Sequence, residues 1–191
     1  METFNTLTNI IRNRRAIFPS VYTGEKVEDS IIEAILENAN WAPTHKFTEP
    51  WRFIIFSGDS LKSLSSYMGE YYENNTPTEK FSELKYNKTI KKPLVSSHVI
   101  AICMKRDEKL TIPEWEELAA VSCAVQNMWL SCTAAGLGSY WSTSGSALNA
   151  SEFLNLEEGT KCYGWFFIGV PKEGVTLHGQ RKPVSEKTKW V

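Results

Sequence analysis

One segment in the second half of the chain constrains the fold more than any other. Residues 118–135 contain no charged side chain. Pro113 and Glu114 precede this run, as is typical of the first turn of a helix, and Gly136 follows it, where helices commonly end. Serine, asparagine, glutamine and threonine interrupt the run, so it is too polar for a bilayer span. We predict a long helix over 114–135 that is surrounded by protein, either the chain's own core or a partner chain.

Shorter apolar patterns predict the rest of the secondary structure. Apolar residues at helical spacing predict helices over 3–13 and 27–39, and the polar segment 60–90 indicates one or two surface helices. Short runs of aromatic and β-branched residues predict strands over 51–57, 97–104, 137–143 and 162–170. Helices between non-adjacent strands are typical of an α/β or α+β sheet flanked by helices. Because no linker or repeat divides the chain, we expect a single domain over residues 1–191.

The charge balance and the N-terminal segment narrow the class of protein. Lys plus Arg number 21 and Asp plus Glu number 22, which gives a net charge of −1. Because binding to a phosphate backbone needs a surplus of basic residues, we expect no nucleic-acid partner. The first residues lack the apolar core and cleavage site of a secretory signal, so the expected location is the cytoplasm, with no membrane partner.

The nucleophilic and metal-ligating side chains form no local motif. The four cysteines include no C-x-x-C pair, and His45, His98 and His178 lie too far apart for a zinc-binding helix motif. The chain also lacks a G-x-x-x-x-G-K phosphate loop and a complete G-x-G-x-x-G loop. We therefore expect reduced thiols, no metal site and no Rossmann dinucleotide site.

Two basic clusters at opposite ends of the chain are candidates for binding a phosphate group. Arg12, Arg14 and Arg15 lie near the N-terminus, and Arg181 and Lys182 lie near the C-terminus. Arginine binds phosphate oxygens through two parallel hydrogen bonds, so clusters that converge in the fold would hold one phosphate group. The alternative is that both clusters are solvated surface charge.

Four segments, taken in their order along the chain, carry a family resemblance. They read RNRRAIFPSVYTGEKV at 12–27, APTHKFTEPWRF at 42–53, WEELAAVSCAVQNMWLSCTAAGLGSYW at 115–141, and FIGVPKEG at 167–174 with QRKPVSEKTKW behind it. The ordered set resembles the FMN-dependent nitroreductase family, in particular its branch of small chains. The resemblance implies a nitroreductase-like α+β fold with a mixed sheet flanked by helices, a long buried central helix and an extended C-terminal segment. It also implies a homodimer with two FMN molecules at the subunit interface.

The resemblance assigns the phosphate end of FMN to the basic clusters. Arg14 and Arg15, together with Arg181 from the C-terminal segment, match the positions that hold the phosphate and the ribityl chain. Ala16 falls at a cofactor-binding position where the family often has serine, which implies one hydrogen bond fewer in this chain.

The flavin ring and the nicotinamide reductant are assigned to other segments by the same resemblance. His45, with Trp41 before it, matches positions that reach the flavin from the partner subunit. Three residues match the turn along the flavin ring, where a backbone N–H points at N5: Trp141, Ser142 and Thr143. Residues 131–136 match the place of NADH or NADPH.

The resemblance implies an NAD(P)H-dependent FMN oxidoreductase that reduces nitroaromatic or quinone-like acceptors by ping-pong hydride transfer through flavin N5. The flavin carries the chemistry, so no catalytic side chain is expected. One alternative is a flavin-holding or redox-sensing protein with little turnover, and another is a structural or interaction protein. The physiological acceptor and the choice between NADH and NADPH stay open.

Overall fold

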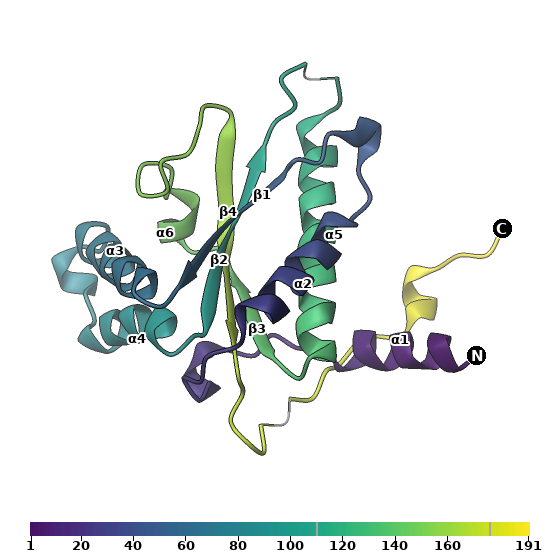
Figure 1. Ribbon diagram of the computed structural model, residues 1–191, viewed down its shortest axis with the longest axis horizontal. Coiled ribbons are helices and arrows are strands. Elements are labelled where there is room, and N and C mark those ends of the chain that lie inside the picture. The colour runs from purple at the N-terminus through teal and green to yellow at the C-terminus, as the bar shows by residue number, and fades with distance from the viewer. Residues whose placement is uncertain (110, 176) are drawn as a thin grey trace.

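A four-stranded antiparallel sheet separates two layers of helices in the computed structural model (Figure 1). The structure describes residues 1–109, 111–175 and 177–191. The strand order β1-β2-β4-β3 places β2 and β4 in the middle of the sheet. The strands are β1 (Trp51–Ser57), β2 (His98–Lys105), β3 (Gly138–Ser142) and β4 (Thr160–Gly169). All four lie where the apolar runs predict them.

The helices cover both faces of the sheet. α2 and α5 lie on one face, while α3 and α6 lie on the other, with α4 packed against α3 (Figure 1). The helices are α1 (Glu2–Asn13), α2 (Asp29–Asn40), α3 (Ser60–Asn74), α4 (Glu83–Leu94), α5 (Glu114–Ala134) and α6 (Gly145–Leu148). Short 3-10 turns occur at Pro19–Val21, His45–Phe47, Thr78–Lys80 and Val184–Lys187. No helix of the described residues is long and apolar enough to cross a membrane.

Strand β2 is buried on both faces and forms the centre of the core. Ile100, Ile102 and Met104 pack in the cluster under α2 and α5, whereas Val99 and Ala101 pack in the cluster under α3 and α6. Successive side chains of a strand point to opposite faces, so a central strand between two helical layers must be apolar throughout. The sequence VIAICM of this strand meets that requirement.

Helix α5 confirms the long helix that the uncharged run predicts. Within one chain it buries one face only, through Glu117, Ala120, Val121, Ala124, Val125, Met128 and Cys132. Glu117 is fully buried because the guanidinium of Arg106 pairs with its carboxylate. The opposite face carries small, uncharged side chains that are exposed: Ala119, Ser122, Cys123 and Gln126. One side of the central helix therefore remains without cover from its own chain.

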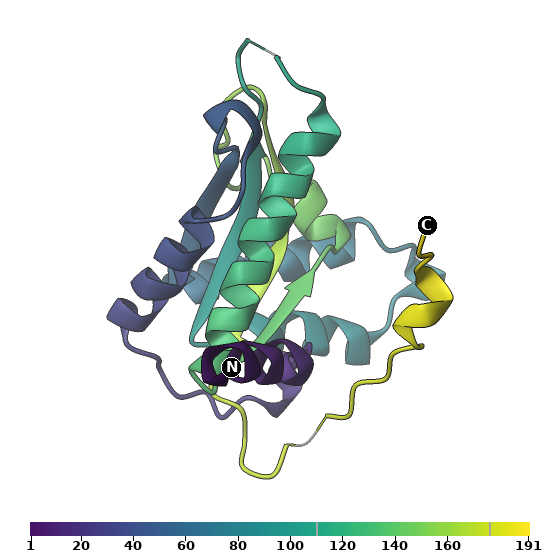
Figure 2. The same cartoon turned by 90° about the vertical axis from the view of Figure 1, so that its right-hand side faces the viewer.

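Both ends of the chain project beyond α5 (Figures 1 and 2). Helix α1 has an apolar stripe that includes Phe4, Leu7 and Ile11, yet none of its residues is buried. Residues 177–191 are exposed along their whole length and contain one short 3-10 turn. The extended C-terminal segment that the resemblance implies is therefore confirmed.

The sheet differs in one respect from the expected one, because its described strands are purely antiparallel rather than mixed. Strands β2 and β3, which α5 connects, run in the same direction. Strand β4 lies between them and runs the opposite way. Because β4 lies between β2 and β3, every neighbouring pair of strands is antiparallel. The predicted α+β class, with helices on both faces of the sheet, is confirmed.

Substituting alanine for Gly164 should destabilise the fold by about 1–3 kcal/mol, because overpacking a filled site forces its neighbours to move. The φ of Gly164 is +150°, and a Cβ there would overlap the indole of Trp141. That indole donates a hydrogen bond from Nε1 to the carbonyl oxygen of Tyr163 at 3.1 Å. Urea unfolding would measure the loss. Gly159→Ala is the matched control, since its φ is +78° but no atom lies within 4 Å of an added Cβ. Equal losses in both variants would show that the indole contact contributes nothing.

Candidate functional site

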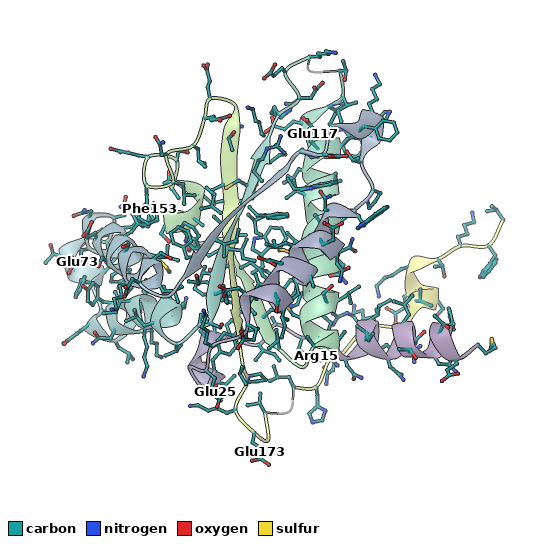
Figure 3. The ribbon with its side chains drawn as sticks, viewed as in Figure 1. Arg15, Glu25, Glu73, Glu117, Phe153 and Glu173 are labelled. Carbon is teal, nitrogen blue, oxygen red and sulfur yellow. The ribbon has the colours of Figure 1, made fainter. Side chains whose placement is uncertain are left out.

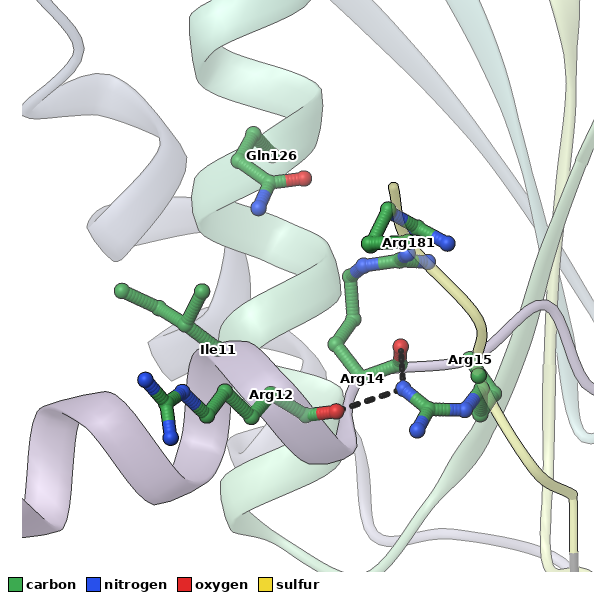
Figure 4. Close-up of a pocket in the computed structure, with 7 residues that line it drawn as sticks. Ile11, Arg12, Arg14, Arg15, Gln126 and Arg181 are labelled. Carbon is green, nitrogen blue, oxygen red and sulfur yellow. Dashed lines mark hydrogen bonds between the residues drawn. The ribbon is translucent and has the colours of Figure 1, made fainter. Parts of the chain in front are cut away.

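A pocket of about 500 Å³ lies where the end of α1, the side of α5 and the C-terminal segment meet (Figure 4). We call it the arginine pocket. Its lining comes from both basic clusters of the sequence and from the uncharged helix between them. The lining residues are Ile11, Arg12, Arg14, Arg15, Gln126, Gly179 and Arg181. The two clusters therefore converge in the fold.

The backbone after α1 explains how Arg14 and Arg15 reach this pocket. The chain leaves the helix at Arg14, whose φ of −58° and ψ of 125° are extended. Three residues later the N–H of Ile17 donates to the carbonyl oxygen of Ser139 in β3 at 2.9 Å. Between these points the Nε1 of Trp129 donates to the carbonyl oxygen of Arg15 at 3.0 Å. The arginines thus lie between α5 and the outer edge of the sheet.

The C-terminal segment is held against Arg15. The Nε of Arg15 donates to the carbonyl oxygen of Leu177 at 3.1 Å. Gly179 lies so close that a Cβ there would be 2.5 Å from the Cζ of Arg15. A side chain at this position would force the end of the Arg15 side chain to move. The passage brings Arg181 to the pocket (Figure 4).

The arginine pocket concentrates positive charge without a compensating carboxylate. Burial, with the nearby guanidinium groups of Arg181 and Arg15, lowers the pKa of Arg14 from its usual value. The Cζ of Arg14 lies 4.6 Å from the ring centroid of Trp129, a cation–π contact. Among the described residues, no salt bridge involves these three arginines. Such a group of cations favours an anionic ligand with several oxygens.

An aromatic row connects the arginine pocket to β3. Trp129 meets Phe166 edge to face, with ring centroids 5.7 Å apart. Phe166 pairs with Trp141 across β4 and β3, and the Trp141 side chain packs on the same face of the sheet. Ser142 is buried and Thr143, just beyond the strand, is exposed. The Trp141 side chain of the predicted flavin turn therefore lies on the α5 face of the sheet, as that of Trp129 does.

His45 lies at the opposite end of α5, whereas Trp41 follows α2, whose Asn38 contacts Asn127 in the middle of α5. The Nδ1 of His45 is 2.5 Å from the Oε2 of Glu116 in the first turn of α5. Trp41 is 79% exposed. Figure 3 shows the two ends of the helix, with Glu117 near one and Arg15 near the other. Trp129 follows Glu116 by 13 positions in the helix. About 20 Å along α5 therefore separates the His45–Glu116 contact from the Arg14–Trp129 contact. One chain does not bring them together.

The loop that carries His45 has an unusual backbone. Lys46, Phe47 and Glu49 have φ values of 52°, 56° and 39°, although none of them is glycine. Each such residue costs free energy, and strain of this kind is concentrated at functional sites. Phe47 is also 89% exposed. This loop therefore exposes an aromatic side chain on a strained backbone.

Residues 131–136, which are expected to contact the nicotinamide, include the last turn of α5. Ser131, Ala134 and Ala135 line a hollow of about 370 Å³, which α1 and α2 border from the other side. The Oγ of Ser131 accepts a hydrogen bond from the Nδ2 of Asn38 at 2.9 Å. The hollow is apolar in most of its lining and is separate from the arginine pocket.

The sequence analysis missed two side chains of the site, Trp129 and Gln126. Both lie in the uncharged run, which we interpreted only as a buried helix. Gln126 is the one glutamine of that run, and a polar side chain on a helix next to an arginine cluster was the available signal. No comparable signal distinguishes Trp129 from a core tryptophan. Ala16 is half-buried. It lies between Arg15 and Ile17, whose N–H donates to the carbonyl oxygen of Ser139.

The protein-family model described as "Nitroreductase family" matches residues 11–170. The chain belongs to the nitroreductase family. This membership confirms the resemblance and the oxidoreductase class that it implies. The matched range contains every candidate site residue of the nitroreductase chain except Arg181, which lies in the C-terminal segment beyond it.

Individual nitroreductases agree with this assignment. "Putative NAD(P)H nitroreductase YfhC" of Bacillus subtilis is 27% identical over 188 residues, which cover 96% of this chain and 93% of that protein. The crystal structure of a nitroreductase-like family protein from Bacillus cereus is 27% identical, with a TM-score of 0.79 and coverage of 97% and 95%. The FMN-dependent nitroreductase NfnB of Mycobacterium smegmatis, solved with NADPH, has a TM-score of 0.78 at 18% identity and coverage of 98% and 99%. The last likeness confirms the fold.

The described part of this nitroreductase contains no group of three or more His, Cys, Asp or Glu side chains placed to hold a metal ion. Of its four free cysteines, Cys103, Cys132 and Cys162 are buried, and Cys123 is exposed on the uncovered face of α5. None of the four lines the arginine pocket.

Proposed function

We propose that the chain is an NAD(P)H-dependent FMN oxidoreductase that reduces nitroaromatic or quinone-like acceptors. The observation that carries this proposal is the arginine pocket. Arg14, Arg15 and Arg181 come from opposite ends of a near-neutral chain and meet without a carboxylate partner among the described residues. Membership of the nitroreductase family indicates that the chemistry at such a site is oxidoreduction. Residues 1–191 form one domain in this proposal, and that domain contains all the FMN-binding residues that one chain contributes.

The arginine pocket fits the phosphate group of FMN. Guanidinium groups bind phosphate oxygens through paired hydrogen bonds, and three of them line the pocket. That of Arg15 already donates to the carbonyl oxygens of Arg12, Arg14 and Leu177, so it contributes mainly its charge. Trp129 supports the guanidinium of Arg14 through its ring face, and the Nε1 of the same indole fixes the backbone of Arg15. These contacts hold the donors in place before the ligand arrives, which lowers the entropy lost on binding.

Strand β3 fits the flat ring of the same cofactor. It is an edge strand, so one row of its backbone groups has no strand partner. Trp141 and Ser142 end this strand and Thr143 follows it, and the Trp141 side chain packs on the α5 side. When bound, FMN supplies the hydride transfer, in a ping-pong sequence through N5 between NADH or NADPH and the acceptor. The side chains bind and orient, and no side-chain acid or base is assigned.

We also propose that the active unit is a homodimer whose sites contain residues of both chains. The uncovered face of α5 and the unburied helix α1 are apolar or uncharged surfaces of the kind that an obligate interface covers. His45 lies about 20 Å along α5 from the Arg14–Trp129 contact of its own chain, and we propose that it, with Trp41, reaches the ligand of the partner. In a twofold-symmetric dimer, each pocket takes these residues from the partner. The extended C-terminal segment is free to lie on that partner.

Flavin absorption provides the test of the proposed function. The purified protein, reconstituted with FMN, should show flavin absorption bands that bleach when NADH or NADPH is added without oxygen. A quinone should then restore the bands, and steady NAD(P)H oxidation should follow when both substrates are present. Bands that bleach without steady turnover would favour the flavin-holding or redox-sensing alternative. A protein that retains no FMN would contradict the proposal. Its predicted cytoplasmic location is not part of this test.

A further inference from the structure

A second pocket, of about 610 Å³, lies on another part of the molecule and shares no lining residue with the arginine pocket. We call it the lysine pocket. Four lysines surround it, and aromatic and aliphatic side chains form its apolar wall. The residues that matter for the argument are Lys88, Lys91, Lys92, Lys172, Phe18 and Tyr22.

The fold assembles the lysine pocket from three distant segments. Lys88, Lys91 and Lys92 belong to α4, and Lys172 follows β4. The backbone N–H of Lys172 donates to the carbonyl oxygen of Val21 at 2.9 Å, which joins the segment after β4 to the turn after Phe18. This backbone contact fixes the relative position of two of the segments, and all four lysines line the same pocket.

The aromatic wall is equally fixed. The Tyr22 ring lies against Gly138 and Gly169, where a Cβ would overlap it, and its hydroxyl donates to the carbonyl oxygen of Ile17 at 2.7 Å. Phe18 packs on Tyr140 with ring centroids 4.4 Å apart, yet half of its surface is exposed. One aromatic ring of the wall is therefore held in place and still accessible.

The charge of the lysine pocket is uncompensated. Among the described residues, no salt bridge involves any of its four lysines. Burial lowers the pKa of Lys92. The negative end of the α4 dipole stabilises Lys91 and Lys92. It does not account for Lys172, which comes from a different segment, so the helix alone does not explain the cluster.

We propose that the lysine pocket binds a small multivalent anion that carries an apolar ring, which is the chemistry of a nucleotide. Lysine binds phosphate as a point charge, and four ammonium groups suit a ligand with several negative charges. The volume lies within the range of small-molecule sites, and such sites combine an apolar wall with a few charged groups. The exposed half of Phe18 offers the surface for the ring.

ATP is the probe, titrated by isothermal calorimetry into the full-length protein. The variant Lys88→Gln/Lys91→Gln should bind ATP at least about tenfold more weakly than the parent, since two charged contacts are lost. The control Lys80→Gln/Lys85→Gln removes the same charge from exposed positions near the same helix, outside the pocket. It should stay within about twofold of the parent, because neither Lys80 nor Lys85 lines the pocket. Arg14→Ala should bind ATP like the parent, which separates this site from the arginine pocket.

Inorganic tripolyphosphate tests the apolar part of the proposal. It carries the charge of ATP without the ring, so it should bind more weakly than ATP, and Phe18→Ala should weaken ATP binding but not tripolyphosphate binding. Absence of ATP binding, equal losses in the pocket variant and the control, or equal affinities for ATP and tripolyphosphate would overturn the proposal.

Discussion

Replacing Arg14 with alanine should weaken FMN binding by about tenfold to a hundredfold, the equivalent of one charge-assisted contact of about 1.5–3 kcal/mol. Arg14 is the residue of the arginine pocket that combines partial burial, a cation–π contact with Trp129 and two neighbouring guanidinium groups. Arg181→Ala should produce a loss of similar size if, as proposed, it supplies a phosphate donor from the other end of the chain. Quenching of FMN fluorescence during titration of the protein would measure both affinities.

Lys182→Ala is the matched control for this experiment. It removes one positive charge from the residue next to Arg181, in the same exposed segment, but Lys182 does not line the arginine pocket. Its FMN affinity should change by less than that of either arginine variant. The phosphate assignment is wrong if FMN binds both arginine variants as tightly as the parent, or if Lys182→Ala loses as much as they do.

Mixing two inactive variants should restore FMN binding in about half of the sites of the mixed dimer. One partner carries Arg14→Glu, and the other carries Trp41→Ala with His45→Ala, so that each homodimer loses its ligand. If each site takes Arg14 from one chain and the Trp41–His45 group from the other, one site of the heterodimer collects all the lesions and its twin collects none. Tagged copies of the two chains, refolded together and purified by both tags, would allow FMN to be counted per dimer.

The same experiment separates the shared site from a site within one chain. With unshared sites, every site of the heterodimer would keep one lesion, and no FMN would be recovered although heterodimers form. Light scattering of the parent protein provides an independent measurement. A monomer with full NAD(P)H oxidation activity would exclude a site that needs both chains.

The sequence predicted the elements of the fold because their residues act locally. The seven residues of β1 were recognised exactly, since WRFIIFS is apolar, β-branched and aromatic and is followed by Gly58 and Asp59. The length of α5 was recognised for a similar reason. The position of β4 between β2 and β3 was not predicted, because it depends on which strands pair, and every pairing would satisfy the same apolar pattern. The mixed sheet was for that reason the wrong expectation.

The site was predictable where its chemistry is concentrated in one residue type. Two basic clusters in a chain of net charge −1 made their arginines candidates for one site, and the family resemblance grouped Arg14, Arg15 and Arg181. The support from Trp129 was not predictable, because a tryptophan in an apolar helix usually belongs to the core. The distance between His45 and the arginine pocket depends on the direction of α5, which no local pattern fixes. The roles of all these residues stay predictions.

Helix α1 has 12 residues, none of them buried, and it ends where Arg14 begins. A helix of that length is marginally stable in water on its own, so its order depends on whatever covers its apolar stripe. If a second chain provides that cover, association and cofactor binding become thermodynamically linked: each must strengthen the other by the same factor. Dilution would then loosen α1 and release the cofactor in a single coupled equilibrium, and the protein's own concentration would set how much of it carries flavin.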